Sequence, residues 1–211
     1  MQNYLNLKND NNPNKLIQPA TVIRNGGIVV FPTETVYGIG TNGLNSKSVQ
    51  KLYTIKKRPF NKPISLLVNN VDMIKQIAKD ITPIEYKIID TFFPGPLTII
   101  LKKKDIIPDI VTAGLPTVGV RIPANDTALN LINIAKVPIA TSSANVSGDP
   151  SGTNISNIID NFSNNINSID YFIDDDKKRT GHASTIIQII NNKPYILRQG
   201  PISLEQINSI L

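Results

Sequence analysis

The chain has 211 residues, with 22 Lys and Arg, 16 Asp and Glu and no Cys, which gives a formal net charge of +6. The absence of Cys excludes disulfides, thiolate metal sites and a Cys nucleophile. The length fits one α/β domain, with or without a short tail, and allows about 70% of the unfolded chain's surface to be buried on folding.

The positive charge favours polyanionic partners, either nucleotides or nucleic acid. A basic surface facing solvent explains the charge more simply, and on charge alone it is the preferred interpretation. The polar, Asn-rich segment from Met1 to Asn14 resembles neither a secretory signal nor a transit peptide, and no run approaches about 18 consecutive apolar residues. We therefore expect a cytoplasmic chain without a membrane segment.

The first elements follow from apolar runs and their boundaries. We expect a polar N-terminal extension over residues 1–15, before a single domain over residues 16–211. Within the domain we predict a helix from Leu16 to Arg24, a buried strand from Ile28 to Phe31, a glycine-rich loop to Asn45, and a helix capped by Ser46 and ending near Lys57.

The remaining elements alternate in the same way. In order we predict a strand over Ile64–Val68, helices from Asp72 and Thr82, strands over Leu97–Leu101 and Thr117–Ile122, a helix capped by Asn125 and ending near Ala135, a strand over Val137–Thr141, a helix over Ile155–Phe162, strands over Tyr171–Ile173, Ser184–Ile190 and Tyr195–Leu197, and a helix capped by Ser203. Strands alternating with helices indicate the α/β class. Because strands crowd late in the chain, we expect a mixed, open sheet with flanking helices.

Polar residues follow the first buried strand, in the segment from Phe31 to Gly40. Two Thr hydroxyls and the Tyr37 phenol lie there at a strand's carboxyl end, where open α/β sheets place their ligands. A polar turn with Gly at positive φ explains the segment equally well.

Four cations occur in the seven residues from Lys56 to Lys62, directly after a predicted helix. Pro59 and Pro63 keep the following chain extended, so the charges cannot all retreat to one helix face. Arg and Lys at this density suit a triphosphate. A solvated charge run remains an equal alternative.

The segment from Ala140 to Gly148 is rich in small hydroxyl residues, which let backbone N–H groups approach an anion. It has no Walker ending, and no nucleophile elbow surrounds Ser142 or Ser143. An ordinary Ser-rich turn is the alternative interpretation.

Arg121 lies in an otherwise apolar strand and Arg198 ends another, so each must be paired or face a ligand. His182, the only His, is interpreted as an exposed loop residue. Asp174 to Asp176 are interpreted as a solvated turn, and no cluster has metal-ligand spacing.

Seven segments in this order resemble the YrdC-like (TsaC-like) threonylcarbamoyl-AMP synthase family. They are Pro32-Thr33-Glu34-Thr35-Val36-Tyr37-Gly38; Lys56-x-Arg58-Pro59 with Lys62-Pro63-Ile64; Pro94-Gly95-Pro96-Leu97-Thr98; Val118-Gly119-Val120-Arg121-Ile122-Pro123; Ser142-Ser143-Ala144-Asn145-x-Ser147-Gly148; Ser184-Thr185-Ile186-Ile187; and Leu197-Arg198-x-Gly200. The resemblance spans about residues 16–203. Each segment is weakly specific alone, but seven in one order are hard to produce by chance.

The resemblance implies a twisted open sheet around a basic cavity, and a nucleotidyltransferase that joins L-threonine, bicarbonate and ATP into threonylcarbamoyl-AMP and pyrophosphate for tRNA modification. It implies Mg²⁺ carried by the ATP phosphates, a downstream tRNA threonylcarbamoyl transferase complex, and possible contact with tRNA. The implied catalytic residues are Lys56 and Arg58. The implied ATP-binding residues are Lys56, Arg58, Lys62, Ser143, Asn145, Ser184 and Arg198, and the implied threonine-binding residues are Thr33, Thr35, Tyr37 and Arg121.

The chain departs from the family at three positions. Gln188 stands where relatives often have Asp, Leu67 where some have His, and Gln199 where Pro is frequent. Two other functions stay open. An RNA-binding module would use a basic face, but no RNA-recognition signature is present. A carbamoyl-transfer domain similar to part of the hydrogenase-maturation proteins usually occurs in longer chains with zinc-finger Cys.

Overall fold

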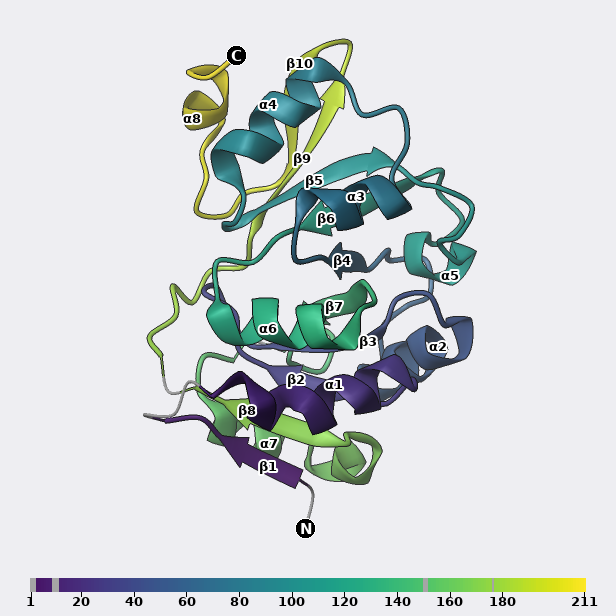
Figure 1. Ribbon diagram of the computed structural model, residues 1–211, viewed down its shortest axis with the longest axis vertical. Helices are drawn as coiled ribbons and strands as arrows, with labels where there is room; N and C mark the ends of the chain where they lie inside the picture. Colours follow the sequence, from purple (N-terminus) through teal and green to yellow (C-terminus); the bar gives the residue numbers. More distant parts are fainter. Residues whose placement is uncertain (1–2, 9–11, 150–151, 176) are drawn as a thin grey trace.

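The computed structural model describes residues 3–8, 12–149, 152–175 and 177–211. Their strands form one sheet in the order β1-β8-β2-β3-β7-β4-β6-β5-β9-β10, which extends along the long axis of the molecule (Figure 1). In chain order the strands are β1 (Asn3–Asn6), β2 (Val29–Phe31), β3 (Gly38–Asn42), β4 (Ser65–Leu67), β5 (Leu97–Lys102), β6 (Thr117–Arg121), β7 (Ile139–Ser143), β8 (Tyr171–Asp174), β9 (Thr185–Ile190) and β10 (Lys193–Arg198).

The sheet is mixed, which confirms the predicted fold class. The pairs β1–β8, β2–β8, β4–β6 and β5–β9 are parallel. The pairs β2–β3, β3–β7, β4–β7, β5–β6 and β9–β10 are antiparallel. Because β3 and β7 join two groups of strands at the middle of the sheet, segments distant in the sequence end side by side there.

Helices flank this sheet. They are η1 (Pro13–Leu16), α1 (Ile17–Arg24), α2 (Ser46–Ile55), α3 (Val71–Ile77), α4 (Pro83–Phe92), α5 (Asp109–Thr112), α6 (Asp126–Ala135), α7 (Ile155–Asn161), η2 (Ser163–Ser168) and α8 (Leu204–Asn208). Figure 1 shows α1 beside α6 over one half of the sheet and α3 with α4 over the other. Within the described ranges, no helix is both long and apolar enough to cross a bilayer.

Local capping signals fix the helix boundaries. Thr82 and Glu85 form the predicted capping box at the start of α4, and Asn125 caps α6 as predicted. At α2 the cap is Asn45, whose side chain accepts from two backbone N–H groups, and Ser46 is the first helical residue. The predicted cap at Ser46 is therefore wrong by one position.

The predicted loop before Asn45 is wrong in part, because β3 occupies Gly38–Asn42 and is wholly buried. Its β-branched residues, Ile39 and Thr41, alternate with Gly38 and Gly40, and glycine is depleted in strands. The reason is space: a Cβ on Gly40 would lie 2.7 Å from the Thr141 hydroxyl oxygen and 2.9 Å from the Ala140 carbonyl oxygen. Only Gly lets β3 and β7 approach this closely.

The polar N-terminal segment is not a simple extension. Asn3–Asn6 pairs in parallel with β8 as an edge strand, and Leu7 is buried in the core. Composition concealed this strand, because an edge strand with one exposed face needs few apolar residues. Residues 3–6 therefore add a strand to the same sheet as the rest of the described chain.

Candidate functional site

A cleft opens where the middle strands of the sheet meet. Its volume is about 720 Å³ when the mouth open to solvent is included, within the range of small-molecule sites. The lining residues are Thr33, Thr35, Val36, Tyr37, Gly38, Arg58, Pro63, Ile64, Ser65, Leu67, Thr98, Arg121, Thr141, Ser142, Ser143, Ala183, Ser184, Ile186 and Arg198. Hydroxyls and guanidiniums dominate the polar part of this surface.

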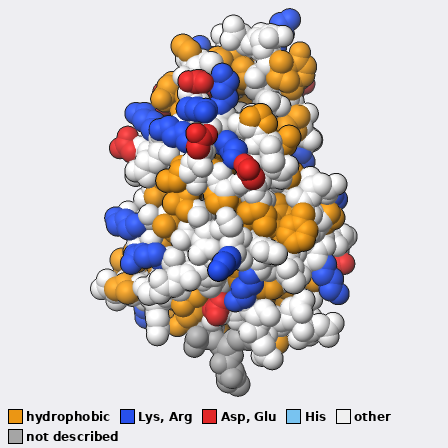
Figure 2. Space-filling model, turned by 90° about the vertical axis from the view of Figure 1, so that its right-hand side faces the viewer, with side chains coloured by type: hydrophobic (Ala, Val, Ile, Leu, Met, Phe, Trp, Pro, Cys, Tyr) orange, Lys and Arg blue, Asp and Glu red, His pale blue; other side chains and the backbone are white. Residues whose placement is uncertain are grey.

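The cleft is strongly positive. Arg58, Arg121 and Arg198 border it, and no Asp or Glu occurs among the described residues that line it. The pKa of Arg198 lies below its ordinary value because partial burial and the charges of Arg121 and Arg58 disfavour its guanidinium. Lys and Arg also cover other parts of the surface, as Figure 2 shows for one face. Inside the cleft, however, three clustered guanidiniums with no acid among the described lining residues point to an anionic ligand.

Arg58 is held by its own loop. Its Nε donates to the Lys62 carbonyl (3.0 Å) and its Nη2 to the Pro63 carbonyl (2.7 Å). The chain predicted to be extended here instead turns, since the Lys62 N–H donates to the Pro59 carbonyl (3.1 Å), and this turn forms a brace for the Arg58 guanidinium. Lys62 itself is exposed and is not among the cleft residues. Its carbonyl therefore contributes to the site by holding Arg58, whereas its ammonium lies in solvent.

Lys56 does not border the cleft. Its side chain is buried, and Nζ donates to the carbonyl of Ser143 (2.5 Å) and to that of Asn145. The pKa of Lys56 falls from 10.5 to about 7 because burial, and next the charge of Arg58, disfavour the ammonium. Lys56 therefore braces the turn after β7 from behind.

That turn carries two more predicted residues. The Ser143 hydroxyl donates to the Asn145 side-chain carbonyl, while the Asn145 amide donates to the carbonyls of Val146 and Asp149, each at 2.8 Å. Ser143 lines the cleft and Asn145 does not. The backbone carbonyl of Lys56 also accepts a hydrogen bond from the Ser147 backbone N–H (2.9 Å). The cation-rich segment and the Ser/Asn turn therefore lie in contact, as the sequence predicts.

Ser184 and Arg198 also line the cleft and are bonded to each other. Arg198 donates from Nε and Nη2 to the Ser184 carbonyl (3.1 and 2.7 Å) and from Nη2 to its hydroxyl (3.1 Å). Gly200 makes this approach possible, since a Cβ there would lie 2.3 Å from the Thr185 backbone nitrogen and 2.5 Å from the Ala183 carbonyl oxygen. Ser184 and Arg198, which belong to separate sequence motifs, thus lie together among the residues that line the cleft.

Arg121 ends β6 and is buried at the floor of the cleft. Its Nε donates to the Gly95 carbonyl (3.0 Å), and its Nη2 donates to the Thr35 hydroxyl (3.1 Å) and lies 2.7 Å from Oε1 of Glu34. The Thr35 hydroxyl also shares a hydrogen bond with that of Thr33 (2.9 Å). Three of the predicted threonine-binding residues thus form one network.

Tyr37 lines the cleft, but its hydroxyl has a partner elsewhere. Its hydroxyl donates to Asp174, and the Arg179 guanidinium lies 3.7 Å above its ring centroid. Burial, and next the hydrogen bond to Asp174, raise the pKa of Tyr37 above its ordinary value. Asp174 is not among the cleft residues, so the Tyr37 hydroxyl is engaged away from the cleft.

The solvated turn predicted over Asp174 to Asp176 is wrong for its first two residues, and Asp176 lies outside the described residues. Asp174 and Asp175 are buried. Asp175 pairs with Arg179 and accepts from the Asn125 amide (3.0 Å), so specific partners replace solvent. His182 is exposed, as predicted.

Four hydroxyl residues of the cleft received no role from the sequence: Ser65, Thr98, Thr141 and Ser142. The Thr98 hydroxyl shares a 2.9 Å hydrogen bond with that of Ser184. The Ser142 hydroxyl is buried and has no hydrogen-bond partner among the described residues. Thr98 and Ser142 occur in segments quoted for the resemblance, but motif order alone does not show which side chains face a cavity.

Comparison with known proteins supports one family. The profile of Sua5, YciO and YrdC, described as "Telomere recombination", matches residues 21–200. A putative threonylcarbamoyl-AMP synthase of Methanocaldococcus jannaschii is 43% identical over 88% of this chain and 85% of its own length. The threonylcarbamoyl-AMP synthase of Pyrococcus abyssi is 38% identical over 91% of this chain and 56% of its own length.

A solved structure agrees with these sequences. The crystal structure of P. abyssi Sua5 complexed with L-threonine superposes with a TM-score of 0.93 at 36% identity, covering 99% of this chain and 60% of that one. The chain therefore spans little more than half the length of this relative. From the profile match, the identities and the shared fold, it follows that the chain belongs to the Sua5/YciO/YrdC family.

Proposed function

We propose that this chain condenses L-threonine, bicarbonate and ATP into threonylcarbamoyl-AMP and pyrophosphate. The observation that carries the proposal is the convergence of Arg58, Arg121 and Arg198 on one hydroxyl-rich cleft. All three reactants are anionic or carry a carboxylate, so they need such a cleft. The names of the relatives, and the threonine complex of one of them, favour this reaction over other uses of a polyanion site.

The chemistry needs alignment and charge neutralisation. The nitrogen of the threonine amine attacks the carbon of bicarbonate, water leaves, and a carbamate forms. A carbamate oxygen then attacks the α-phosphorus, and the bond to the β-phosphate oxygen breaks as pyrophosphate leaves in line. No covalent protein nucleophile is required, which agrees with a chain that has no Cys and an exposed His182.

The residues divide this task between two walls. We propose that Arg58 and Ser143 on one side, and Ser184 and Arg198 on the other, hold the nucleotide. Lys56 supports the side that carries Arg58 and Ser143, because its ammonium braces the turn after β7. Asn145 supports the same side by accepting a hydrogen bond from the Ser143 hydroxyl. Lys62 can reach the triphosphate only from the solvent side.

The opposite end of the cleft takes the amino acid. We propose that Arg121 binds the threonine carboxylate, with Thr33 and Thr35 at its side. Tyr37 would shape this end without donating its hydroxyl, which is bonded to Asp174. Apolar neighbours such as Leu67 and Val36 can pack against the threonine methyl group.

Mg²⁺ would enter on the nucleotide. The described residues contain no group of three His, Asp or Glu that could hold a metal ion, and the cleft offers hydroxyls and guanidiniums. The residues therefore do not form a site for the ion by themselves, and no step is assigned to it. We propose that the product passes to a tRNA threonylcarbamoyl transferase complex in the cytoplasm.

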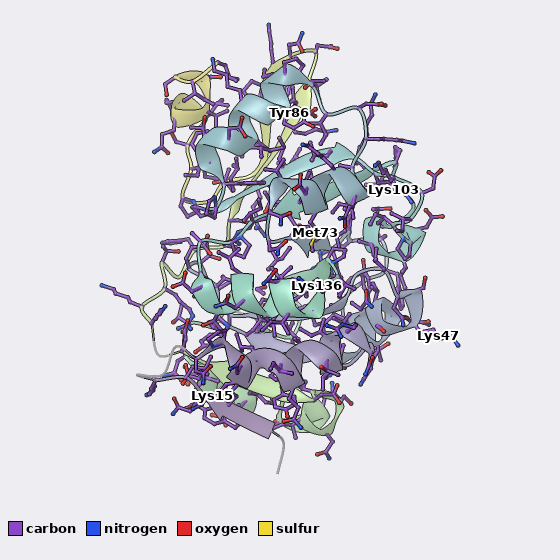
Figure 3. All side chains as sticks on the ribbon, in the orientation of Figure 1. Lys15, Lys47, Met73, Tyr86, Lys103 and Lys136 are labelled. Atoms are coloured by element: carbon purple, nitrogen blue, oxygen red, sulfur yellow. The ribbon has the colours of Figure 1, made fainter. Side chains whose placement is uncertain are left out.

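The test is pyrophosphate release from Mg-ATP and bicarbonate, with and without L-threonine, with the adenylate identified by mass spectrometry. We expect release only with threonine. Arg58→Ala should abolish most of it, whereas Lys47→Ala should not. Lys47 is a matched control because it lies on α2 yet points into solvent at the edge of the molecule (Figure 3). Release that ignores threonine, or no release at all, would overturn the proposal.

A further inference from the structure

Glu34 lies directly behind the cleft and is not among its lining residues. It stands between Thr33 and Thr35, and its Oε1 is 2.7 Å from Nη2 of Arg121. The side chains are 19% and 8% exposed. Because the described residues of the cleft include no acid, Glu34 is the carboxylate through which this group of guanidiniums is partly neutralised.

The pair is poorly arranged for stability. Neither carboxylate oxygen of Glu34 is exposed to solvent, and neither accepts a well-aligned hydrogen bond from a described residue, despite the short distance to Arg121. A buried carboxylate whose lone pairs are incompletely satisfied costs more than its ion pair returns. Its presence therefore calls for a role other than holding the fold together.

The contacts of Arg121 show what that role is. One edge of its guanidinium, Nε and Nη2, is occupied by Gly95, Thr35 and Glu34. For Nη1, no hydrogen-bond acceptor occurs among the described residues. A guanidinium held on one edge presents the rest of its fork in a fixed direction, which is the geometry that a carboxylate recognises.

The backbone behind Glu34 is fixed as well. The Thr180 N–H donates to the Glu34 carbonyl and the Gly181 N–H to the Thr35 carbonyl, each at 3.0 Å. The Glu34 side chain thus projects from a segment that is bonded on its other side to the loop after β8. The backbone that carries the Glu34 carboxylate is therefore fixed in front of Arg121.

We infer that Glu34 is a positioning residue that holds Arg121 so that its free Nη1 edge takes the carboxylate of the amino-acid substrate. The identity of that substrate rests on the proposed function, whereas the action of Glu34 through Arg121 does not. Glu34 touches no reactant in this arrangement.

The Glu34→Gln substitution distinguishes a positioning role of Glu34 from a purely electrostatic one. The substitution keeps the shape but makes the site one unit more positive, which by Coulomb's law attracts every anion more strongly. If Glu34 acted only as a charge, KM would fall for both ATP and threonine. If it positions Arg121, KM for threonine should rise on the order of tenfold while KM for ATP stays the same or falls. Glu205→Gln on α8, exposed, is the matched control and should change neither.

Two further measurements test the route through Arg121. In an Arg121→Lys background, Glu34→Gln should change KM for threonine less than twofold. Rotation of the Arg121 guanidinium, followed by nitrogen NMR of the free protein, should be slow in the wild type and fast in Glu34→Gln. Equal loss of ATP and threonine affinity, an undiminished effect in the Arg121→Lys background, or unchanged rotation would each overturn the inference. If the wild type fails to use threonine, the proposed function falls, and the NMR result still decides the role of Glu34.

Discussion

The buried ammonium of Lys56 makes the stability of this protein depend on pH in a direction that can be calculated. The pKa of Lys56 is 10.5 in the unfolded chain and about 7 in the folded one. Between these values the unfolded chain binds about one more proton, so the free energy of unfolding rises with pH by about 1.4 kcal/mol per unit. Below pH 7 both states are protonated, and this contribution is flat.

Lys56→Met removes this dependence. Met fills similar space but cannot donate to the carbonyls of Ser143 and Asn145. Because Met does not titrate, the contribution of residue 56 to the stability of the variant is the same at every pH. The wild type should therefore gain about 3 kcal/mol relative to the variant between pH 7.5 and 9.5, by the same slope. Burial of the charged ammonium destabilises the folded wild type. Its free energy of unfolding therefore rises as Lys56 loses its proton.

Urea denaturation at half-unit steps from pH 6 to 9.5 measures the difference. Lys47→Met, at an exposed position of the same helix, controls for loss of a lysine and should give a constant difference from the wild type. A constant difference for Lys56→Met across the range would show that the folded protein keeps the ordinary pKa of Lys56, and the argument from burial would fail.

Other substitutions test the cleft and the fold. Arg58→Ala should weaken ATP binding by about 1.5–3 kcal/mol in calorimetry, the scale of a charge-assisted contact, and an unchanged affinity would make it a surface residue. Arg121→Ala should lower threonine affinity and largely keep ATP affinity; the reverse result would contradict its assignment. Gly200→Ala should lower the unfolding free energy by about 1–3 kcal/mol through the clash with residues 183–185, which an unshifted Tm would refute. Thr82→Ala should cost about 1 kcal/mol by removing the α4 cap, with activity unchanged; lost activity would show a wider role.

The sequence predicts best those elements whose signals are local. The start of α4 follows from the Thr82 capping box and that of α6 from the Asn125 cap, since both depend on hydrogen bonds within one turn. Strand β3 was missed because its glycines are explained only by the closeness of β7. Strand β1 was missed because its partner β8 lies far along the chain.

The same distinction applies to the candidate site. Motif order identifies Arg58, Arg121 and Arg198, all of which border the cleft. It does not separate them from Lys56, which has the same charge but a buried ammonium. Which cation faces ligand and which braces backbone depends on a turn almost ninety residues away, at Ser143. Glu34 was overlooked for the same reason, because its importance comes from its contact with Arg121, which lies on β6 far along the chain.

The charge of the cleft matches the main physical difficulty of the proposed reaction. A carbamate and a triphosphate repel each other, and two unit charges about 5 Å apart at an effective dielectric constant near 20 cost about 3 kcal/mol. Fixed guanidiniums remove this cost without moving, because Arg58, Arg121 and Arg198 are each held by backbone carbonyls before any ligand arrives. Such preorganised charges stabilise a transition state more than flexible ones, since no reorganisation accompanies the attack. The carbonyl braces, rather than the number of cations, should therefore set the rate.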